Sequence, residues 1–235
     1  MTLNFLNVPT ESIYQKFIPK KHFYSHGDLT TAEKNLFVNN IERLTLHAQL
    51  TRANTNIPVY KEDQRTYEEV AIFLLELRSK ENLQRIVRII MDTIPYPMIL
   101  VAKDLDSYSF YGAHQRDNLI DQSKIILEEI YHTDFISEDH EFVQKINYKK
   151  LNKMNFYQLY DDYIKQLIGY NLKKRNIKQI DNQAELLAAI EEKEEKIKLL
   201  RNKLKKEKHF NKKMELNMQI KKIEQELKQM EDKHD

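Results

Sequence analysis

The segment at residues 93–100, TIPYPMIL, places two prolines one residue apart and then continues into an apolar block. Only 5 prolines occur in the 235 residues, so this pair marks a boundary. Pro95 ends a helix because it lacks an amide donor and pushes Ile94 out of the α region. Pro97 holds Tyr96 extended and suits the first position of a strand, where no ladder donor is needed. The segment therefore predicts a helix joined almost directly to a buried strand.

The residues on both sides of this joint predict a mixed sheet. Upstream, residues 69–77 (EVAIFLLEL) form the continuous apolar run of a central strand, and residues 80–92 carry an apolar helical stripe. Downstream, residues 98–103 and 108–114 form two strands around a tight turn. The first link should be a right-handed parallel crossover and the second an antiparallel hairpin.

Further elements flank this core. Residues 44–50 alternate apolar and polar side chains, which predicts a half-buried strand and makes the sheet four-stranded. Apolar stripes at helical spacing predict helices at about 30–41, 119–131 and 155–169. Residues 1–29 are expected to be irregular apart from a short helix at 10–16, and residues 51–67 are expected to be a long connection. The fold class is therefore α/β (α+β), with a small mixed four-stranded sheet and flanking helices.

The last part of the chain predicts a helical arm. After residue 181 there is neither Pro nor Gly, and apolar residues recur at intervals of three and four in two seams. The seams are out of register across residues 205–213 (KKEKHFNKK), so either one long helix carries a stutter or the chain turns back as a helical hairpin. The lack of turn residues favours one long coiled-coil helix. Because a lone stripe of this length is unstable in water, the arm should pair, most simply in a parallel homodimer, or else with a larger protein.

Composition limits the chemistry. The chain has 3 Gly, none close together, which excludes Gly-rich phosphate-binding loops. It has no Cys, which excludes disulfides, thiol nucleophiles and cysteine zinc sites. Because no segment resembles a signal peptide or a membrane span, we expect a cytoplasmic protein with no membrane contact. We also expect no cofactor and no metal site. The expected domains are an irregular segment (1–29), a mixed α/β domain (30–135), a basic helical segment (136–180) and a coiled-coil arm (181–235).

Charge is segregated although the net charge is only +2. Residues 142–180 hold nine Lys or Arg against two acids, and residues 196–213 hold nine against Glu207 alone. Such blocks contact nucleic-acid phosphates or an acidic protein, and they also occur as solvated faces of Lys-rich helices. Among the lysines, an exposed Phe210 is expected to dock on a partner or on the globular domain. The candidate contact residues are Lys149, Lys150, Lys153, Lys173, Lys174, Arg175, Arg201, Lys205, Lys206, Lys208, Phe210, Lys212 and Lys213.

One pattern suggests an enzyme. Restriction-type nucleases place an acid-x-Lys pair on a strand, with another acid upstream, to hold Mg²⁺ and position water. Here the pair is Glu76-x-Arg78, Lys80 falls in the helix cap, and the upstream acid would be Glu68 or Glu69. The alternative is that Glu76 and Arg78 are the polar fringe of a buried strand.

Several segments, taken in order, resemble a bacterial family known as domain of unknown function 4391. They are IPKKHFY (18–24), FVNNIERLTLHAQL (37–50), EVAIFLLEL (69–77), DTIPYPMIL (92–100), FYQLYDDYIKQL (156–167) and KKEKHFNKKMELNMQIKKIEQEL (205–227). The resemblance implies a small α/β domain with a C-terminal coiled coil, encoded beside helicases and DNA methyltransferases of restriction-like or phage-defence operons, and it assigns no catalytic residue.

The functional expectation is therefore a non-enzymatic accessory subunit of a DNA-processing system, assembling through residues 181–235. Its partner would be a second copy or a larger protein such as a helicase or DNA methyltransferase. The alternatives are a nucleic-acid-binding protein that uses residues 142–180 and 196–213, and a divergent metal-dependent nuclease centred on Glu76.

Overall fold

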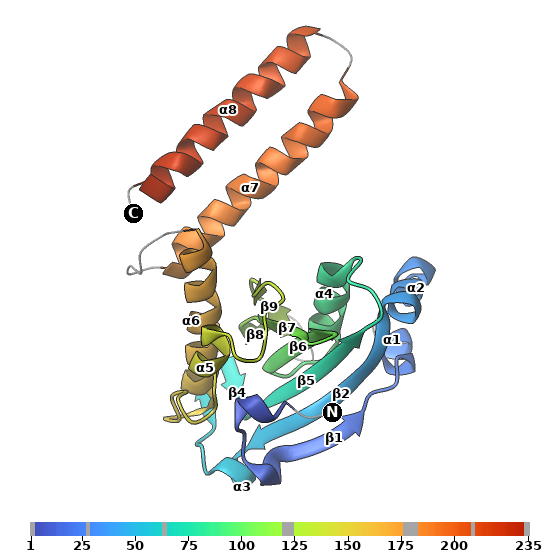
Figure 1. Cartoon of the computed structure of the whole chain (residues 1–235), viewed down its shortest axis with the longest axis vertical. Coiled ribbons are helices and arrows are strands. Elements are labelled where there is room, and N and C mark those ends of the chain that lie inside the picture. Colours follow the sequence, from blue (N-terminus) through green and yellow to red (C-terminus); the bar gives the residue numbers. More distant parts are fainter. Residues whose placement is uncertain are drawn as a thin grey trace. The chain divides into compact units, whose positions relative to one another are not determined.

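The computed structural model describes residues 3–26, 29–62, 65–118, 125–175, 183–207 and 210–232. The chain divides into two compact units, Met1–Leu167 and Ile168–Asp235, which we call the body and the arm (Figure 1). Within the described residues, no helix is both long enough and apolar enough to cross a membrane.

A six-stranded sheet forms the centre of the body, in the order β1-β2-β5-β6-β7-β10. Its strands are β1 (Ile13–Phe17), β2 (Ile41–Thr51), β5 (Glu69–Leu77), β6 (Met98–Asp104), β7 (Ser107–Gly112) and β10 (Tyr131–His132). Strands β5 and β6 are parallel, and all other neighbours are antiparallel. The mixed sheet, the parallel crossover and the β6–β7 hairpin are confirmed. The predicted number of four strands was wrong, because the sheet has one further strand at each edge.

Both extra strands are short and irregular. β1 lies in residues 1–29, which we expected to be irregular apart from a helix at 10–16; of that helix only a 3-10 turn at Thr10–Ser12 is present, and Asn4–Leu6 form a second such turn. Its ladder with β2 contains a bulge between Ile13 and Lys16, where Gln15 has a φ of 51°. β10 has only two residues. Such strands form because a longer neighbouring strand supplies their hydrogen bonds. The sequence of the short strand alone therefore gives little indication that it is a strand.

The joint between helix and strand is built as predicted. Helix α4 (Leu83–Thr93) ends at Ile94, whose backbone is extended, with φ −100° and ψ 108°. Strand β6 begins directly after Pro97, and the carbonyl of Pro97 accepts a hydrogen bond from the Ala71 amide of β5 at 2.9 Å. The second proline therefore stands where the parallel pairing of β5 and β6 begins.

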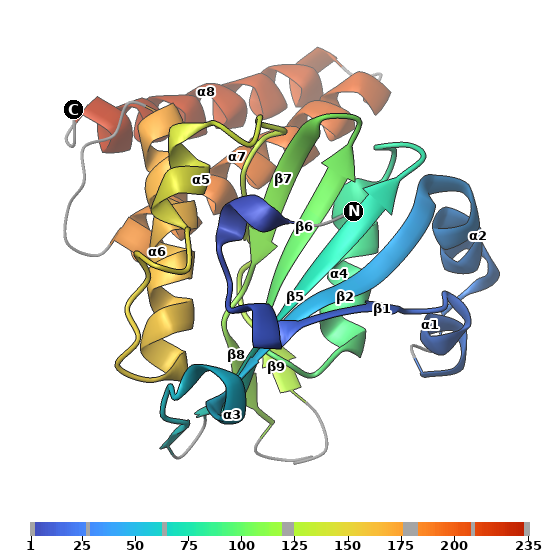
Figure 2. The ribbon, with the colours of Figure 1, turned by 60° about the horizontal axis from the view of Figure 1, so that its bottom comes forward.

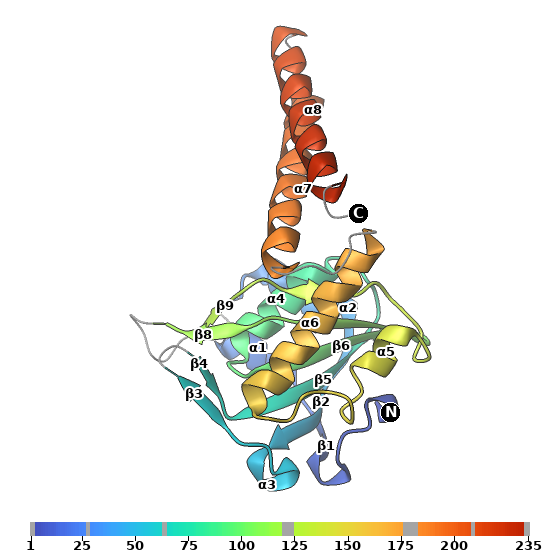
Figure 3. The ribbon, with the colours of Figure 1, turned by 90° about the vertical axis from the view of Figure 1, so that its left-hand side faces the viewer.

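Helices cover both faces of the sheet (Figures 2 and 3). They are α1 (Lys21–His26), α2 (Thr31–Asn40) and α4 on one face, and α5 (Glu141–Lys145) and α6 (Phe156–Lys174) on the other. On the first face, Phe23 and Phe37 pack with Phe73 and Leu100 of the sheet in one buried cluster. On the second face, α6 passes over β7 at Gly112.

Two short ribbons accompany the sheet. They are β3 (Tyr60–Glu62) with β4 (Arg65–Tyr67), and β8 (Gln115–Asp117) with β9 (Ile125–Leu127). The predicted helix at 119–131 was wrong where the chain is described, since 125–127 and 131–132 are strands and 119–124 lie outside the described residues. The β-branched Ile125 and Ile126 favour extended backbone, and pairing with β8 outweighs the helical spacing of the apolar residues. The expected connection at 51–67 also holds helix α3 (Arg52–Thr55) and the first ribbon.

Beyond the end of α6 the arm forms a helical hairpin, so the prediction of one long coiled-coil helix was wrong. Helix α7 (Gln183–Lys206) and helix α8 (Phe210–Asp232) pack against each other. The two predicted seams face one another, and their contact consists of Ile197, Leu200, Ile220 and Ile223, flanked by Leu204, Leu216 and Leu227. Ion pairs join the helices at 2.5 Å between Lys193 and Glu226 and at 2.7 Å between Arg201 and Glu224. The slip in register thus coincides with a reversal of the chain, made without Gly or Pro.

Candidate functional site

The acids proposed for a nuclease site lie at opposite ends of one strand. Glu76 is near the end of β5, in register with Arg43 of β2 and Lys103 of β6. Glu69 begins the same strand and accepts a hydrogen bond from Gln49 at 2.7 Å. At about 3.3 Å per residue, the two acids are roughly 23 Å apart. The described part of the chain contains no group of three His, Cys, Asp or Glu side chains placed to hold a metal ion.

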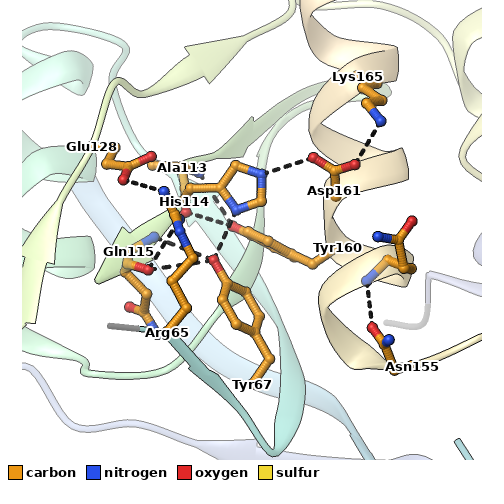
Figure 4. A network of polar contacts seen from close by, with 11 residues as sticks. Arg65, Tyr67, Ala113, His114, Gln115, Glu128, Asn155, Tyr160, Asp161 and Lys165 are labelled. Atoms are coloured by element: carbon orange, nitrogen blue, oxygen red, sulfur yellow. Dashed lines mark hydrogen bonds and ion pairs between the residues drawn. The ribbon is translucent and has the colours of Figure 1, made fainter. Parts of the chain in front are cut away.

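Polar side chains from β4, the β7–β8 connection and α6 meet in one network (Figure 4). His114 lies between Tyr67 and Asp161, with 2.8 Å from its Nδ1 to the Tyr67 hydroxyl and 3.3 Å from its Nε2 to Asp161 Oδ1. Asp161 also binds the Lys165 ammonium at 2.7 Å. The network joins residues far apart in the chain, and no sequence motif marks it.

Burial and hydrogen bonding fix the protons of this network. Burial raises the pKa of Tyr67 to about 12, so its hydroxyl keeps its proton at neutral pH. Burial alone would raise the pKa of Asp161, but hydrogen bonds from His114 and Lys165 outweigh it and hold that pKa below its usual value. The Gln115 amide donates to the Tyr67 oxygen at 3.4 Å. Tyr67 is therefore assigned as the donor to Nδ1 of His114, whose Nε2–H donates to Asp161.

The chemistry open to this network is limited. Both ring nitrogens of His114 are engaged, and the ring stacks on Tyr157 with centroids 5.5 Å apart and planes 29° apart. Arg65, on the same strand as Tyr67, forms an ion pair with Glu128 at 2.6 Å and donates a hydrogen bond to the Gln115 carbonyl at 3.4 Å. A base whose nitrogens are both occupied has no position left for a substrate proton. We infer that the network positions α6 on the two ribbons.

A pocket of about 350 Å³ lies where β5 leads into α4. In its wall, Gln84 Nε2 lies 2.9 Å from His132 Nε2, and the His132 ring stacks on Tyr111 with centroids 5.2 Å apart. Lys80 pairs with Asp104 at 2.6 Å beside it. Ligands of open α/β sheets commonly bind beyond the carboxyl ends of parallel strands, so the pocket is in a favourable place. Because its lysine is already neutralised, its charges do not select one class of ligand.

The basic residues proposed on the body lie in the turn between α5 and α6. Lys149, Lys150 and Lys153 are exposed. The Lys153 ammonium donates to the carbonyls of Lys149 and Leu151 at 3.1 and 3.0 Å and lies 5.0 Å from the Tyr148 ring centre. This part of the predicted basic segment is therefore a turn that uses one of its lysines to hold its own backbone.

The basic residues proposed on the arm differ in what they contact. Arg175 pairs with Glu194 at 2.8 Å, and Arg201 pairs with Glu224, so both serve the arm's own structure. Of the other candidates, the exposed lysines are Lys173, Lys174, Lys205, Lys206, Lys212 and Lys213. Lys208 lies outside the described residues, and so does the side chain of Phe210, although Phe210 begins α8. The candidates thus belong to two units, and the hairpin carries its own concentrated group.

Comparison with known proteins places the chain in a family. The family model described as Domain of unknown function (DUF4391) matches residues 6–227. The chain belongs to this family. The DUF4391 match extends along α8 to Leu227, so the hairpin is part of what defines the family and not an appendage to its α/β body. No curated protein and no solved structure matched the chain.

Proposed function

We propose that this DUF4391 chain is a non-enzymatic interaction subunit of a DNA-processing system and that the helical hairpin is its assembly element. The observation that carries the proposal is the outer surface of the hairpin. Leu199 of α7 is 55% exposed, and Met214 and Met218 of α8 are 51% and 67% exposed. These side chains lie on the helix faces opposite to the seams that join α7 and α8.

Exposed apolar side chains at helical spacing are a common way to bind another protein. Met214 and Met218 are one turn apart, so they form one continuous strip along α8. Methionine adapts its shape to a partner, and flanking lysines such as Lys213 and Lys221 would favour an acidic surface. The expected partner is a helicase or DNA methyltransferase encoded nearby, as the family resemblance implies.

Affinity purification of the tagged full-length chain from its own host, followed by mass spectrometry, tests this proposal. Met214→Asp with Met218→Asp should remove the DNA-processing partner. The matched control is Met154→Asp, because Met154 is 71% exposed but lies on the body. Recovery of the same partner with the hairpin variant as with the control would contradict the proposal.

A second candidate function is direct nucleic-acid binding by the lysines near the hairpin turn. Lys205, Lys206, Lys212 and Lys213 are exposed and make no ion pair with any described residue. Lysines in that state can neutralise phosphates, and each phosphate contact adds about 0.9 to the slope of log affinity against log salt for duplex DNA. Fluorescence anisotropy should therefore show a steep slope that falls by about two in Lys205→Glu with Lys206→Glu. Flat isotherms at low salt would remove this candidate.

A further inference from the structure

We propose that two copies of this chain associate through their hairpins in antiparallel orientation, so that the basic half of each hairpin lies on the acidic half of the other. The inference rests on the proposed function, because it takes the hairpin to be the assembly element, and it names a partner for a surface other than the methionine strip. The observations that carry it are the charge pattern of the two helices and a groove along their side.

Each helix of the hairpin changes charge near its middle. In α7, residues 183–195 hold five acids against Lys193, and residues 196–206 hold six Lys or Arg and no acid. In α8 the order is reversed, since residues 210–222 hold four lysines against Glu215 and residues 223–232 hold four acids against Lys228. The end of the hairpin near the turn is therefore strongly basic, and the opposite end is strongly acidic.

The hairpin places like charges side by side. Because α7 and α8 run in opposite directions, the basic half of α7 lies beside the basic half of α8, and the two acidic halves also lie together. The charge changes sign at the same level in both helices, as shown by the ion pairs of Lys193 with Glu226 and of Arg201 with Glu224 near that level. The acidic half is compensated in part, since Glu194 pairs with Arg175 and Glu226 with Lys193. Lys205, Lys206, Lys212 and Lys213 of the basic half make no ion pair with any described residue, so their mutual repulsion remains. A partner with the opposite order of charges would relieve it.

A second hairpin supplies that order when it is turned end to end. The acidic part of α7 has 13 residues and the basic part has 11, so each extends roughly 16–20 Å from the change of sign. In a dimer whose twofold axis passes through the level where the charge changes sign, the acidic half of each hairpin lies on the basic half of the other. This is the self-complementary arrangement of a symmetric dimer. A parallel dimer would instead face basic halves with basic halves.

The side of the hairpin has space and apolar surface for this contact. A groove of about 480 Å³ lies on it, lined by Glu194 and Glu224 next to the change of sign and by Arg201 and Lys205 in the basic half. Ile197 forms part of the same lining. The seam between the helices is already buried, since Leu200 is 9% and Ile223 is 8% exposed, so a second hairpin would add to this core from outside. Two hairpins side by side would then pack as the helices of a four-helix bundle do.

The test is sedimentation of the full chain and of charge-reversed variants. The tip variant carries Lys198→Glu and Lys205→Glu, and the base variant carries Glu191→Lys and Glu195→Lys. We expect the wild-type dimer to weaken with added salt and each variant alone to dimerise about tenfold more weakly. An equimolar mixture of the two variants should recover association, because each hairpin then meets a partner of opposite charge. Far-ultraviolet circular dichroism checks that the variants keep their helices.

Four results would overturn the inference. They are a wild-type chain that stays monomeric with its helices formed, a dimer that strengthens with salt, variants that dimerise as well as wild type, and a mixture that fails to associate. A parallel dimer gives the second of these results. A monomeric chain that still captures its partner through Met214 and Met218 would leave the proposed function intact. Nucleic-acid binding that falls in the tip variant and rises in the base variant, in a monomeric chain, would instead support the second candidate function.

Discussion

Substitution of Gly112 by alanine should destabilise the body, because α6 leaves no room for a side chain there. A Cβ on Gly112 would lie 2.7 Å from Tyr163 Cε1, 2.8 Å from Ile164 Cδ1 and 3.2 Å from Leu167 Cδ1. The tightest contact is with a ring that cannot swing away, since Tyr163 is fully buried and its hydroxyl donates to the Tyr111 carbonyl at 3.1 Å. The helix must therefore shift away from β7, or the sheet must bend.

The expected cost follows from the size of the clash. Inserting one methyl group into a packed core typically costs about 1–3 kcal/mol of unfolding free energy, and a contact to a fixed ring places Gly112→Ala in the upper part of that range. The gain in stability from reducing the freedom of the unfolded chain, about 0.4–1 kcal/mol for Gly→Ala, offsets only part of it. The net loss should be about 1–2 kcal/mol.

The same substitution at Gly169 is the matched control. Gly169 lies within α6, and no described atom other than its own helix is within 4 Å of the Cβ that alanine would add. Gly169→Ala should therefore stabilise by about 0.5–1 kcal/mol through helix propensity. Urea unfolding followed by circular dichroism and by tyrosine fluorescence measures both, since the chain has 13 Tyr and no Trp. Equal effects of the two substitutions would refute the close approach of α6 to β7.

Three further predictions concern titratable groups. His47 is 1% exposed, and burial lowers its pKa, so the unfolded chain binds the proton more readily than the folded chain does. The unfolding free energy should therefore fall as the pH drops below about 6.5. In urea titrations at several pH values, His47→Leu should flatten this dependence. Asp161→Asn should cost about 1–3 kcal/mol in the same assay by breaking the charge-assisted bonds to His114 and Lys165. Glu76→Ala should leave any Mg²⁺-dependent DNA cleavage unchanged; loss of cleavage in that variant would restore the nuclease hypothesis.

The centre of the fold could be predicted because its signals are local. The apolar run of β5, the stripe of α4 and the prolines of the joint each specify one element without help from the rest of the chain. Strands β1, β9 and β10 could not be predicted in this way, because their backbone conformation depends on neighbours that are distant in sequence. At Ile125 and Ile126 the apolar spacing suited a helix, and only the ladder with β8 decided for a strand.

The polar network was harder still to foresee. Tyr67, His114 and Asp161 lie on separate elements, and no spacing rule joins residues that meet only after the sheet and α6 have packed. The pair Glu76-x-Arg78 suggested a nuclease site instead, because an acid and a basic residue at the end of a strand can be recognised without knowing the fold. By contrast, the apolar stripe of residues 155–169 could be recognised from helical spacing alone, and Phe156, Tyr160 and Tyr163 within it are fully buried.

The reversal of the chain in the arm changes what its charges can do. In one long helix the basic residues 196–213 would lie in the middle between two acidic ends, and a parallel homodimer would place basic middle on basic middle. The hairpin places the basic middle at one end and brings both acidic segments to the other, so the two ends of the hairpin carry opposite charges. A helix pair of this kind repels a parallel copy and attracts an antiparallel one. The same linear charge pattern therefore predicts a different partner geometry once the turn is known, and salt dependence decides between the two.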